Sequence, residues 1–209
     1  MTPERDYGFR IAACGHWVFD LDGTLTLPVH DFAYIRSELG VPAGTDILDH
    51  LAALPEAEAR PLHRRLQEIE TDLASVTSAA AGAEELVRLL LENGARCGVL
   101  TRNTRQNALH TLELIGLGDC FTPETVLGRA EALPKPDPEG IHLLASRWGT
   151  EPSSTVMVGD YLFDLQSGRA AGSVTVHVDP TRSFPWPELT DIGVATLEEL
   201  AGYLRDRAE

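Results

Sequence analysis

The chain has 209 residues, 43% of them apolar, with 18 glycines and 13 prolines, which is typical of a soluble globular protein with one domain or one domain and a smaller insert. Its formal net charge of −15 disfavours binding to nucleic acid or to an anionic membrane, so an anionic small ligand must be held by local groups. Residues 1–17 include acidic side chains, and the chain nowhere has about 18 apolar residues in a row, so we expect a cytoplasmic protein without a membrane partner.

Short runs rich in β-branched residues alternate with longer helical patterns along most of the chain. We predict strands at residues 16–21, 96–101, 154–160, 173–179 and 192–195. We predict helices at residues 83–93, 103–115, 138–148, 164–171 and 197–207. This alternation predicts βαβ units, and therefore an α/β fold with a parallel sheet.

Three of these helices begin with residues that commonly cap a helix or form a capping box. The capping patterns are Asn103 with Gln106, Asp137 with Pro138, and Thr196 with Glu199. We therefore expect these helices to begin at or directly after the first residue of each pair.

Residues 28–82 interrupt the alternation of strands and helices. They contain three helical patterns with no strand candidate between them, followed by an alanine-rich hinge at residues 79–83. A helical insert after the first strand is the simplest account. We predict a core domain of residues 1–27 and 83–209, and a small helical domain of residues 28–82.

Two side-chain types have an informative distribution. The cysteines Cys14, Cys97 and Cys120 are odd in number and far apart in apolar surroundings, so we expect buried thiols rather than a disulfide or metal framework. Sixteen of the 17 basic residues are arginines, which leaves Lys135 as the only lysine of the protein.

Polar residues follow three of the predicted strands at their carboxyl ends, the edge where open parallel sheets bind ligands. Each of these residues taken alone is also typical of a strand end or a helix cap, but chain order and position agree for the whole set. The set consists of Asp20, Asp22, Gly23 and Thr24 after the first strand, Thr101 after the second, Asp160 and Asp164 at the third, and Lys135 in the segment before the helix at 138–148.

The four aspartates of this set imply a metal ion. Four carboxylates in one cleft form six like-charged pairs, each of which costs about 2–4 kcal/mol at about 4–8 Å, so a cation must lie among them. Oxygen ligands without a cysteine or histidine cluster favour a hard divalent ion, and Mg²⁺ fits best. A calcium loop of the EF-hand type is excluded, because Gly23 and Asp31 do not stand where such a loop needs its glycine and glutamate.

The same set creates a place for a phosphate group inside an acidic protein. The backbone amides of Arg102 and Asn103 are expected to open a helix, and helix N-termini favour phosphate. Gly23 permits close approach of the backbone, and the hydroxyls of Thr24 and Thr101 can donate to phosphoryl oxygens. With a metal and the single lysine, these groups describe a phosphoryl-transfer site.

The nucleophile of this site must be a carboxylate, as in aspartyl-phosphate chemistry, because the set contains no serine or cysteine next to a base. A turn at Gly23 can bring the carboxylates of Asp20 and Asp22 to one phosphorus atom. We expect Asp20 to attack the phosphorus, and Asp22 to protonate the leaving oxygen and then activate water.

The segments DLDGT at residues 20–24, LTRN at 100–103, PKPDP at 134–138 and GDYLFD at 159–164 resemble the four motifs of the haloacid dehalogenase superfamily of phosphohydrolases. The resemblance covers nearly the whole chain. It implies a Rossmann-like core with a doubly wound parallel sheet, and a helical cap at residues 28–82 similar to that of phosphoglycolate phosphatases. The second aspartate of DLDGT argues for phosphate chemistry, because the dehalogenases of the superfamily lack it. Leu27 and Pro28 stand where phosphoglycolate phosphatases and related mutases often have Asp-Ser, so the substrate does not follow from the resemblance.

The resemblance also implies a role for each site residue. Asp20 would be the nucleophile, Asp22 the acid and base, and Thr101 and Lys135 the phosphate binders. The implied Mg²⁺ site consists of the Asp20 side chain, the Asp22 carbonyl and the Asp160 side chain, with Asp164 outside the ligand set supporting either the metal or Lys135.

These observations predict an Mg²⁺-dependent phosphatase that hydrolyses a small phosphorylated metabolite, a phosphate monoester, through an aspartyl-phosphate intermediate. A phosphomutase of a sugar phosphate is the alternative within the same chemistry, and release of inorganic phosphate separates the two. A non-catalytic module that binds a phosphorylated ligand is an alternative of another class, which the complete set of site residues disfavours.

Basic residues of the helical insert are candidates for substrate specificity. They are His30, just beyond the first hinge, and the cluster Arg60, His63, Arg64 and Arg65. A solvated helix face is favoured for the cluster, because acidic residues stand at pairing distance along the chain: Glu56, Glu58 and Glu68.

Overall fold

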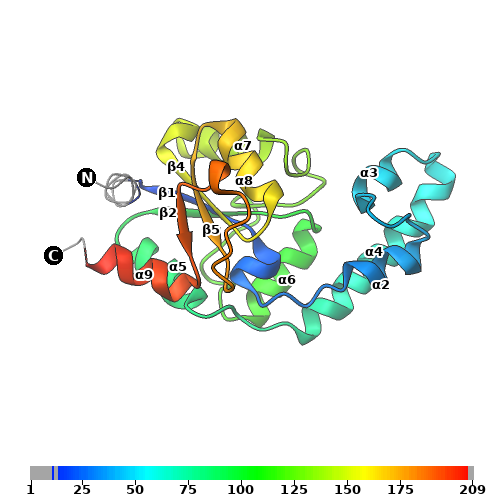
Figure 1. The fold of residues 1–209 in the computed structure, drawn as a ribbon, viewed down its shortest axis with the longest axis horizontal. Coiled ribbons are helices and arrows are strands. Elements are labelled where there is room, and N and C mark those ends of the chain that lie inside the picture. The colour runs from blue at the N-terminus through cyan, green and yellow to red at the C-terminus, as the bar shows by residue number, and fades with distance from the viewer. Residues whose placement is uncertain (1–10, 12–13, 207–209) are drawn as a thin grey trace.

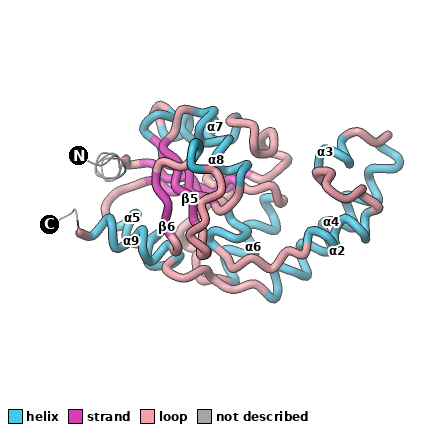
Figure 2. The backbone as a smooth tube through the Cα atoms, viewed as in Figure 1, coloured by secondary structure: helices cyan, strands magenta, loops and turns pink. Residues whose placement is uncertain are grey.

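Six strands form one parallel sheet in the order β3-β2-β1-β4-β5-β6 (Figures 1 and 2). The structure, a computed structural model, describes residue 11 and residues 14–206, so most of the segment 1–17 lies outside the described residues. Within the described part, no helix is long and apolar enough to cross a membrane. The strands are β1 (His16–Phe19), β2 (Arg96–Leu100), β3 (Val126–Leu127), β4 (Thr155–Gly159), β5 (Val174–Val178) and β6 (Ile192–Val194).

Helices cover both faces of the sheet. Successive side chains of a strand point to opposite faces, and here both sets are apolar, so each face needs a covering layer. Trp17 and Phe19 of β1 belong to one buried cluster, and Val18 belongs to another. The first face packs against α5 (Ala83–Glu92), α6 (Arg105–Leu114) and α9 (Leu197–Arg205), and the second against α7 (Glu139–Trp148) and α8 (Leu162–Ala171) (Figure 1). The predicted α/β fold with a doubly wound parallel sheet is therefore confirmed.

The predicted strands are present, each shorter by one or two residues than its predicted range. The sequence does not predict β3, because two residues are too few to carry a strand pattern. β3 pairs with β2 at the edge of the sheet, and the amide of Thr101 donates to the carbonyl of Leu127 at 2.9 Å. The missed strand thus fixes the backbone at one of the predicted site residues.

Two of the three predicted capping patterns supply a side-chain acceptor where they were expected. The Thr196 hydroxyl accepts from the Glu199 amide at 3.2 Å, and α9 begins at the next residue. The Asp137 carboxylate accepts from the Glu139 amide at 2.9 Å, but Pro138 is the N-cap and α7 begins at Glu139, one residue later than predicted. Both interactions satisfy backbone donors that a helix leaves without an intrahelical partner.

The predicted capping box of Asn103 with Gln106 is wrong. The cap of α6 is Thr104, whose hydroxyl accepts from the Asn107 amide at 3.2 Å, and the helix begins at Arg105. Asn103 instead accepts from the Thr104 amide through its side-chain oxygen at 2.8 Å. The helix begins one residue or more later than predicted, because the Thr104 hydroxyl accepts from the amide three residues further on and the Asn103 side chain does not.

Three helices follow β1 and form what we call the helical unit: α2 (Phe32–Leu39), α3 (Ile47–Ala52) and α4 (Glu56–Val76). Ile35, Leu51 and Leu66, one from each helix, belong to a buried cluster separate from the two clusters of the sheet. Figures 1 and 2 show the unit beyond the carboxyl end of β1, away from both termini. The division of the chain at residues 28 and 82 stays a prediction, which this separate cluster supports.

The two connections between the helical unit and the sheet run side by side. Thr26 and Ala79 form an antiparallel bridge. On either side of it the Leu27 amide donates to the carbonyl of residue 78, and the Ala80 amide donates to the Leu25 carbonyl, both at 2.9 Å. α4 also packs against α6. These contacts hold the helical unit over the edge of the sheet where the predicted site residues lie.

The cysteines agree only in part with the predicted buried thiols. Cys97 is buried, and burial raises the pKa of its thiol to about 12. Cys14 and Cys120 are half-buried, so the prediction is wrong for these two. Cys14 lies in the segment before β1, and Cys120 lies in the loop between α6 and β3.

Candidate active site

A cleft of about 360 Å³ lies at the carboxyl edge of the sheet, between the strands and the helical unit. Asp20 directly follows β1, Thr101 follows β2 and Asp160 follows β4. Because these strands are parallel neighbours, they place the three side chains at one edge. The cleft is lined by these predicted site residues: Asp20, Asp22, Thr101, Arg102, Asn103, Lys135, Asp160 and Asp164.

The segment after β1 turns so that both of its aspartates line the same cleft. Asp20 leaves the strand with extended angles, φ −70° and ψ 161°, and the next residue, Leu21, is fully buried in the core. Asp22 departs from helical geometry with φ −83° and ψ 106°, and Gly23 has a φ of +97°. The turn expected at Gly23 is therefore present, and it allows Asp20 and Asp22 to face one ligand.

Gly23 and Thr24 hold Asp160 in place. The fully buried Thr24 hydroxyl donates to Asp160 Oδ1 at 3.0 Å. A Cβ atom on Gly23 would lie 2.5 Å from Asp160 Oδ2, so only glycine leaves room for this carboxylate. The predicted phosphate contacts of Gly23 and Thr24 stay predictions, because the structure assigns the Thr24 proton to Asp160.

We expect Gly23→Ala to reduce the free energy of unfolding by more than the same change at Gly94. Both glycines have a positive φ, +97° and +79°, which costs an alanine about 1–2 kcal/mol, but nothing lies within 4 Å of a Cβ at Gly94. The excess loss at Gly23, about 1 kcal/mol or more, comes from displacing the Asp160 carboxylate. Urea unfolding of the two variants measures the difference, and equal losses would show that the Gly23–Asp160 contact carries no energy.

Lys135 lies buried between carboxylates, with 2% of its surface exposed. Its ammonium nitrogen contacts Asp20 Oδ1 and lies 2.7 Å from Asp164 Oδ1. The other Asp164 oxygen accepts from the Tyr161 amide at 3.0 Å. Asp20, Asp160 and Asp164 each offer an oxygen within 4.8 Å of the other two. One lysine thus faces three carboxylates, and the cluster keeps an excess of negative charge.

Burial and the charges of neighbouring groups shift the pKa values of this cluster. Burial raises the pKa of Asp20, and the charges of Asp164 and Asp160 add to this effect while Lys135 opposes it. Burial, followed by the charge of Asp164, raises the pKa of Asp160 to about 6. Burial lowers the pKa of Lys135, but its two carboxylate partners outweigh burial and the net pKa is raised. An all-oxygen donor set with excess negative charge suits a hard divalent ion.

The loop after β2 brings a hydroxyl group into the cleft. The Asn103 amide donates to Thr101 Oγ1 at 3.0 Å, which leaves the Thr101 hydroxyl proton for another acceptor. Because α6 begins at Arg105, the amides of Arg102 and Asn103 do not open the helix as the sequence predicted. Their contact with a phosphate stays a prediction, without the support of a helix N-terminus at that point.

The haloacid dehalogenase-like hydrolase family profile matches residues 34–178, more than half of the chain. The chain belongs to this family. The matched segment contains Thr101, Lys135 and Asp160 and begins after Asp20 and Asp22, whose roles stay predictions. This chain is 30% identical over 190 residues to an uncharacterized hydrolase of Saccharomyces cerevisiae. The alignment covers 88% of this chain and 87% of the relative.

Two further similarities agree with the assignment. This chain is 31% identical over 178 residues to the pyrophosphatase PpaX of Bacillus pumilus. The alignment covers 77% of this chain and 81% of the relative. A solved structure of a hydrolase from Pseudomonas syringae aligns with a TM-score of 0.74 at 19% identity. The alignment covers 93% of this chain and 100% of the Pseudomonas chain, and at this identity it supports the fold alone. The predicted membership of the superfamily is confirmed, and relatives named as phosphatases support an enzyme of the phosphatase type.

A buried ion pair joins the helical unit of the hydrolase to the core. Arg129, in the loop after β3, donates to both carboxylate oxygens of Glu70 of α4, at 2.7 and 2.9 Å. The side chain of Arg129 is 12% exposed and that of Glu70 is 9% exposed. Asn107 of α6 donates to the Glu70 carbonyl at 3.2 Å. The sequence did not predict this pair, because its members lie 59 positions apart on different elements.

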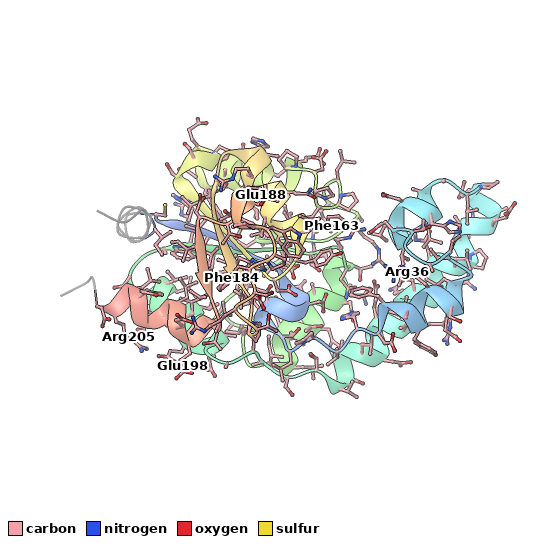
Figure 3. All side chains as sticks on the ribbon, viewed as in Figure 1. Arg36, Phe163, Phe184, Glu188, Glu198 and Arg205 are labelled. Carbon is pink, nitrogen blue, oxygen red and sulfur yellow. The ribbon has the colours of Figure 1, made fainter. Side chains whose placement is uncertain are left out.

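Arg102 connects three parts of the cleft. One guanidinium nitrogen donates to the Lys135 carbonyl and another to the Asp46 carboxylate, both at 2.6 Å. Asp46 caps α3 of the helical unit, where it accepts from the Asp49 amide at 3.1 Å. The guanidinium also lies 4.7 Å from the ring centre of Phe163, which Figure 3 labels on the side of the core that faces the helical unit. The Arg102 side chain is therefore engaged by protein groups, and the sequence indicated only its backbone.

Most basic residues of the insert lie away from the cleft. Arg60 pairs with Glu56 at 2.7 Å, and Arg65 pairs with Glu38 at 2.8 Å and with Glu68 at 3.3 Å, on an exposed face of α4. The predicted solvated face is thus confirmed for Arg60 and Arg65, while the described structure holds no ion pair of Glu58. Of the five basic candidates in the insert, all of them described residues, His30 alone lines the cleft.

Proposed function

We propose that this hydrolase is an Mg²⁺-dependent phosphatase of small phosphate monoesters that works through an aspartyl phosphate on Asp20. The observation that carries the proposal is the buried contact between Asp20 and Lys135 at one end of a cleft, with Thr101 and Asp160 beside it. A small phosphorylated metabolite is the partner that such a site serves. The cytoplasmic location stays a prediction.

In the first step, a carboxylate oxygen of Asp20 attacks the phosphorus atom as the bond to the leaving oxygen breaks. Lys135 is held charged by its two carboxylate partners and offers an ammonium proton to a phosphoryl oxygen. The Thr101 hydroxyl offers its own proton in the same way. Asp22, which lines the cleft on the same segment as Asp20, gives its proton to the leaving alkoxide, and the alcohol departs.

In the second step, Asp22 acts as the base. Now ionised, it takes a proton from a water molecule, whose oxygen attacks the phosphorus of the aspartyl phosphate. The bond between the phosphorus and the Asp20 oxygen breaks, so that inorganic phosphate leaves, Asp20 returns as a carboxylate and Asp22 is protonated again. No cosubstrate other than water is needed for this balance.

The acidic cluster fits Mg²⁺. The side chains of Asp20 and Asp160 and the carbonyl of Asp22 would hold it, and Asp164, which belongs to the same group of oxygens, would support it through its contact with Lys135. When bound, the ion supplies positive charge that offsets the repulsion between the phosphate and the carboxylates. The pKa values of Asp20 and Asp160, raised first by burial and then by neighbouring carboxylates, agree with a site that gains from a bound cation.

Release of inorganic phosphate from a panel of phosphate monoesters, with Mg²⁺ and with excess chelator, tests the proposed function. We expect Mg²⁺-dependent phosphate release. An isomerised sugar phosphate without phosphate release would establish a phosphomutase instead. Ligand binding without turnover of any ester would establish a non-catalytic module, and full activity in excess chelator would contradict the metal requirement.

We expect Mg²⁺ affinity to fall on acidification from pH 7 to pH 5. The pKa of Asp160 is about 6, so on acidification a proton increasingly occupies the carboxylate that the metal needs, and the dissociation constant rises about tenfold in total between pH 7 and pH 5. Calorimetric titration of the protein with Mg²⁺ at constant ionic strength measures the constant, and the same titration of Asp160→Asn serves as the control. A dissociation constant that is the same at pH 5 and pH 7 would contradict the role of Asp160.

A further inference from the structure

We propose that the leaving group of the substrate carries an uncharged aromatic ring, which binds in the part of the cleft formed by the helical unit. This inference rests on the proposed function and names the class of ester that the cleft selects. Three observations carry it: four aliphatic side chains in the wall of the cleft, two exposed aromatic side chains that line the same cleft, and charges that do not favour a second anionic group.

The wall of the cleft contributed by the helical unit contains four aliphatic side chains beside the charged Arg36, Asp46 and Glu70. Ile35 of α2, Ile47 and Leu48 of α3, and Leu66 of α4 line it. Ile35, Ile47 and Leu66 belong to the buried cluster of the helical unit, so the wall is the inner side of a packed core and is held in a fixed shape. A leaving group bound here exchanges water for hydrocarbon, which favours an apolar group.

Two large aromatic side chains at the cleft are more than half exposed. Phe32, the first residue of α2, is 55% exposed, and Tyr161, directly before α8, is 53% exposed. Both line the cleft, one from the helical unit and one from the core. Large apolar side chains exposed around a pocket are typical of a binding surface. Together they offer aromatic surface on both sides of one space.

Aromatic contacts continue from each of these two rings. The Phe32 ring stacks on His30 with centres 5.6 Å apart and planes at 17°. Tyr161 contacts Phe163 edge to face at 5.2 Å, and Phe163 carries the Arg102 guanidinium at 4.7 Å. The rim of the cleft is thus built from planar groups on both sides. Planar groups stack favourably on a planar ligand, which selects a ring over a flexible chain of similar size.

The charges of the cleft do not favour a second anionic group on the substrate. Six carboxylates line it, against three cations, Arg36, Arg102 and Lys135. Arg102 and Lys135 are engaged by carboxylates. Arg36, labelled in Figure 3, donates to the backbone carbonyls of residues 45 and 32 at 3.0 and 3.2 Å. Arg129 pairs with Glu70, so a divalent ion at the acidic cluster brings the charges of the cleft close to balance. The three lining cations already donate to protein acceptors, so nothing there favours an acidic leaving group.

Four phosphate monoesters of primary alcohols test the inference with purified enzyme and Mg²⁺. Ethyl phosphate is the reference, and 2-phenylethyl phosphate adds a neutral ring. 2-Aminoethyl phosphate adds a cation, and phosphoglycolate adds a carboxylate. We expect kcat/KM for 2-phenylethyl phosphate to exceed that of each of the other three by about tenfold to a hundredfold, as burial of one ring predicts.

Variants of the two exposed rings locate the effect. We expect Phe32→Ala and Tyr161→Ala each to lower the ratio of kcat/KM for 2-phenylethyl phosphate to that for ethyl phosphate by about threefold or more. Tyr203→Ala is the matched control, because Tyr203 is 46% exposed on α9 at another face and should leave both values unchanged.

The outcomes separate the two levels of the proposal. If ethyl phosphate is hydrolysed but 2-phenylethyl phosphate shows no advantage, the inference about the ring is wrong and the phosphatase stands. A preference for 2-aminoethyl phosphate or phosphoglycolate overturns it in the same way. An advantage of the ring that survives both alanine variants would place the ring elsewhere in the cleft and overturn the assignment to Phe32 and Tyr161. If none of the four esters nor the wider panel releases phosphate, the proposed function fails, and the inference with it.

Discussion

Asp20→Asn should lower phosphatase turnover by at least about a thousandfold while the protein stays folded. The amide of asparagine has no carboxylate oxygen with which to form an acyl phosphate. It has nearly the shape of aspartate, and Lys135 keeps its contact with Asp164 at 2.7 Å, so the buried cluster retains a charge pair. Steady-state phosphate release, with circular dichroism to confirm the fold, measures the effect.

Asp119→Asn is the matched control for this prediction. Asp119 is an exposed aspartate whose ion pair with Arg88 lies at 3.0 Å on the surface, outside the cleft. We expect the control variant to keep full turnover, because an exposed pair contributes little to stability and nothing to the site. Turnover of Asp20→Asn comparable to that of Asp119→Asn would refute Asp20 as the nucleophile.

Lys135→Arg and Lys135→Met should both lose at least about a hundredfold in turnover. The lysine is 2% exposed and packed between Asp20 and Asp164, where a broad, planar guanidinium does not fit although its charge is the same. Methionine fills similar space but leaves two buried carboxylates without their cation. A chain that has arginine at sixteen of its 17 basic positions and lysine at this one agrees with a need for a compact ammonium.

The free energy of unfolding distinguishes a buried ion pair at Lys135 from an exposed one. Removal of one partner of a buried pair costs about 3–5 kcal/mol, so Lys135→Met should show a loss of that size in urea unfolding without added metal. Arg88→Met, which breaks exposed pairs with Asp119 and Glu84, should lose about 1 kcal/mol or less. If Lys135→Met and Arg88→Met lose the same free energy of unfolding, and Lys135→Arg keeps normal turnover, then the Lys135 ion pairs contribute no more than exposed pairs and Lys135 has no part in catalysis.

The sequence predicts the residues at strand ends well, for a physical reason. Strands buried on both faces are nearly continuous apolar runs, so a polar residue directly after such a run marks the carboxyl end of the strand. Asp20, Thr101 and Asp160 stand at such ends, and parallel pairing of β1, β2 and β4 brings them to one edge. The start of α6 was placed wrongly because two neighbouring polar residues, Asn103 and Thr104, both resemble caps and only the local geometry decides between them.

Contacts between the helical unit and the core were beyond prediction. The Arg129–Glu70 and Arg102–Asp46 pairs depend on how two separately packed groups of helices meet, and no local pattern reports that geometry. The same holds for Phe32 and Tyr161, because in sequence each is an ordinary aromatic residue near a helix start. The sequence therefore indicates the chemistry of the site, while the shape of the cleft, and with it the substrate, comes from tertiary packing.

Rapid acid quench of Asp22→Asn with an aryl phosphate tests the aspartyl phosphate most directly. An aryloxide leaves without help from an acid, but hydrolysis of the acyl phosphate needs a base, so the intermediate should accumulate when Asp22 is an amide. We predict a burst of about one equivalent of phenol and, by peptide mass spectrometry, one phosphoryl group on Asp20. The same experiment with the Asp20→Asn, Asp22→Asn double variant should give neither. A burst without a label on Asp20, or a label that persists in the double variant, would contradict the mechanism.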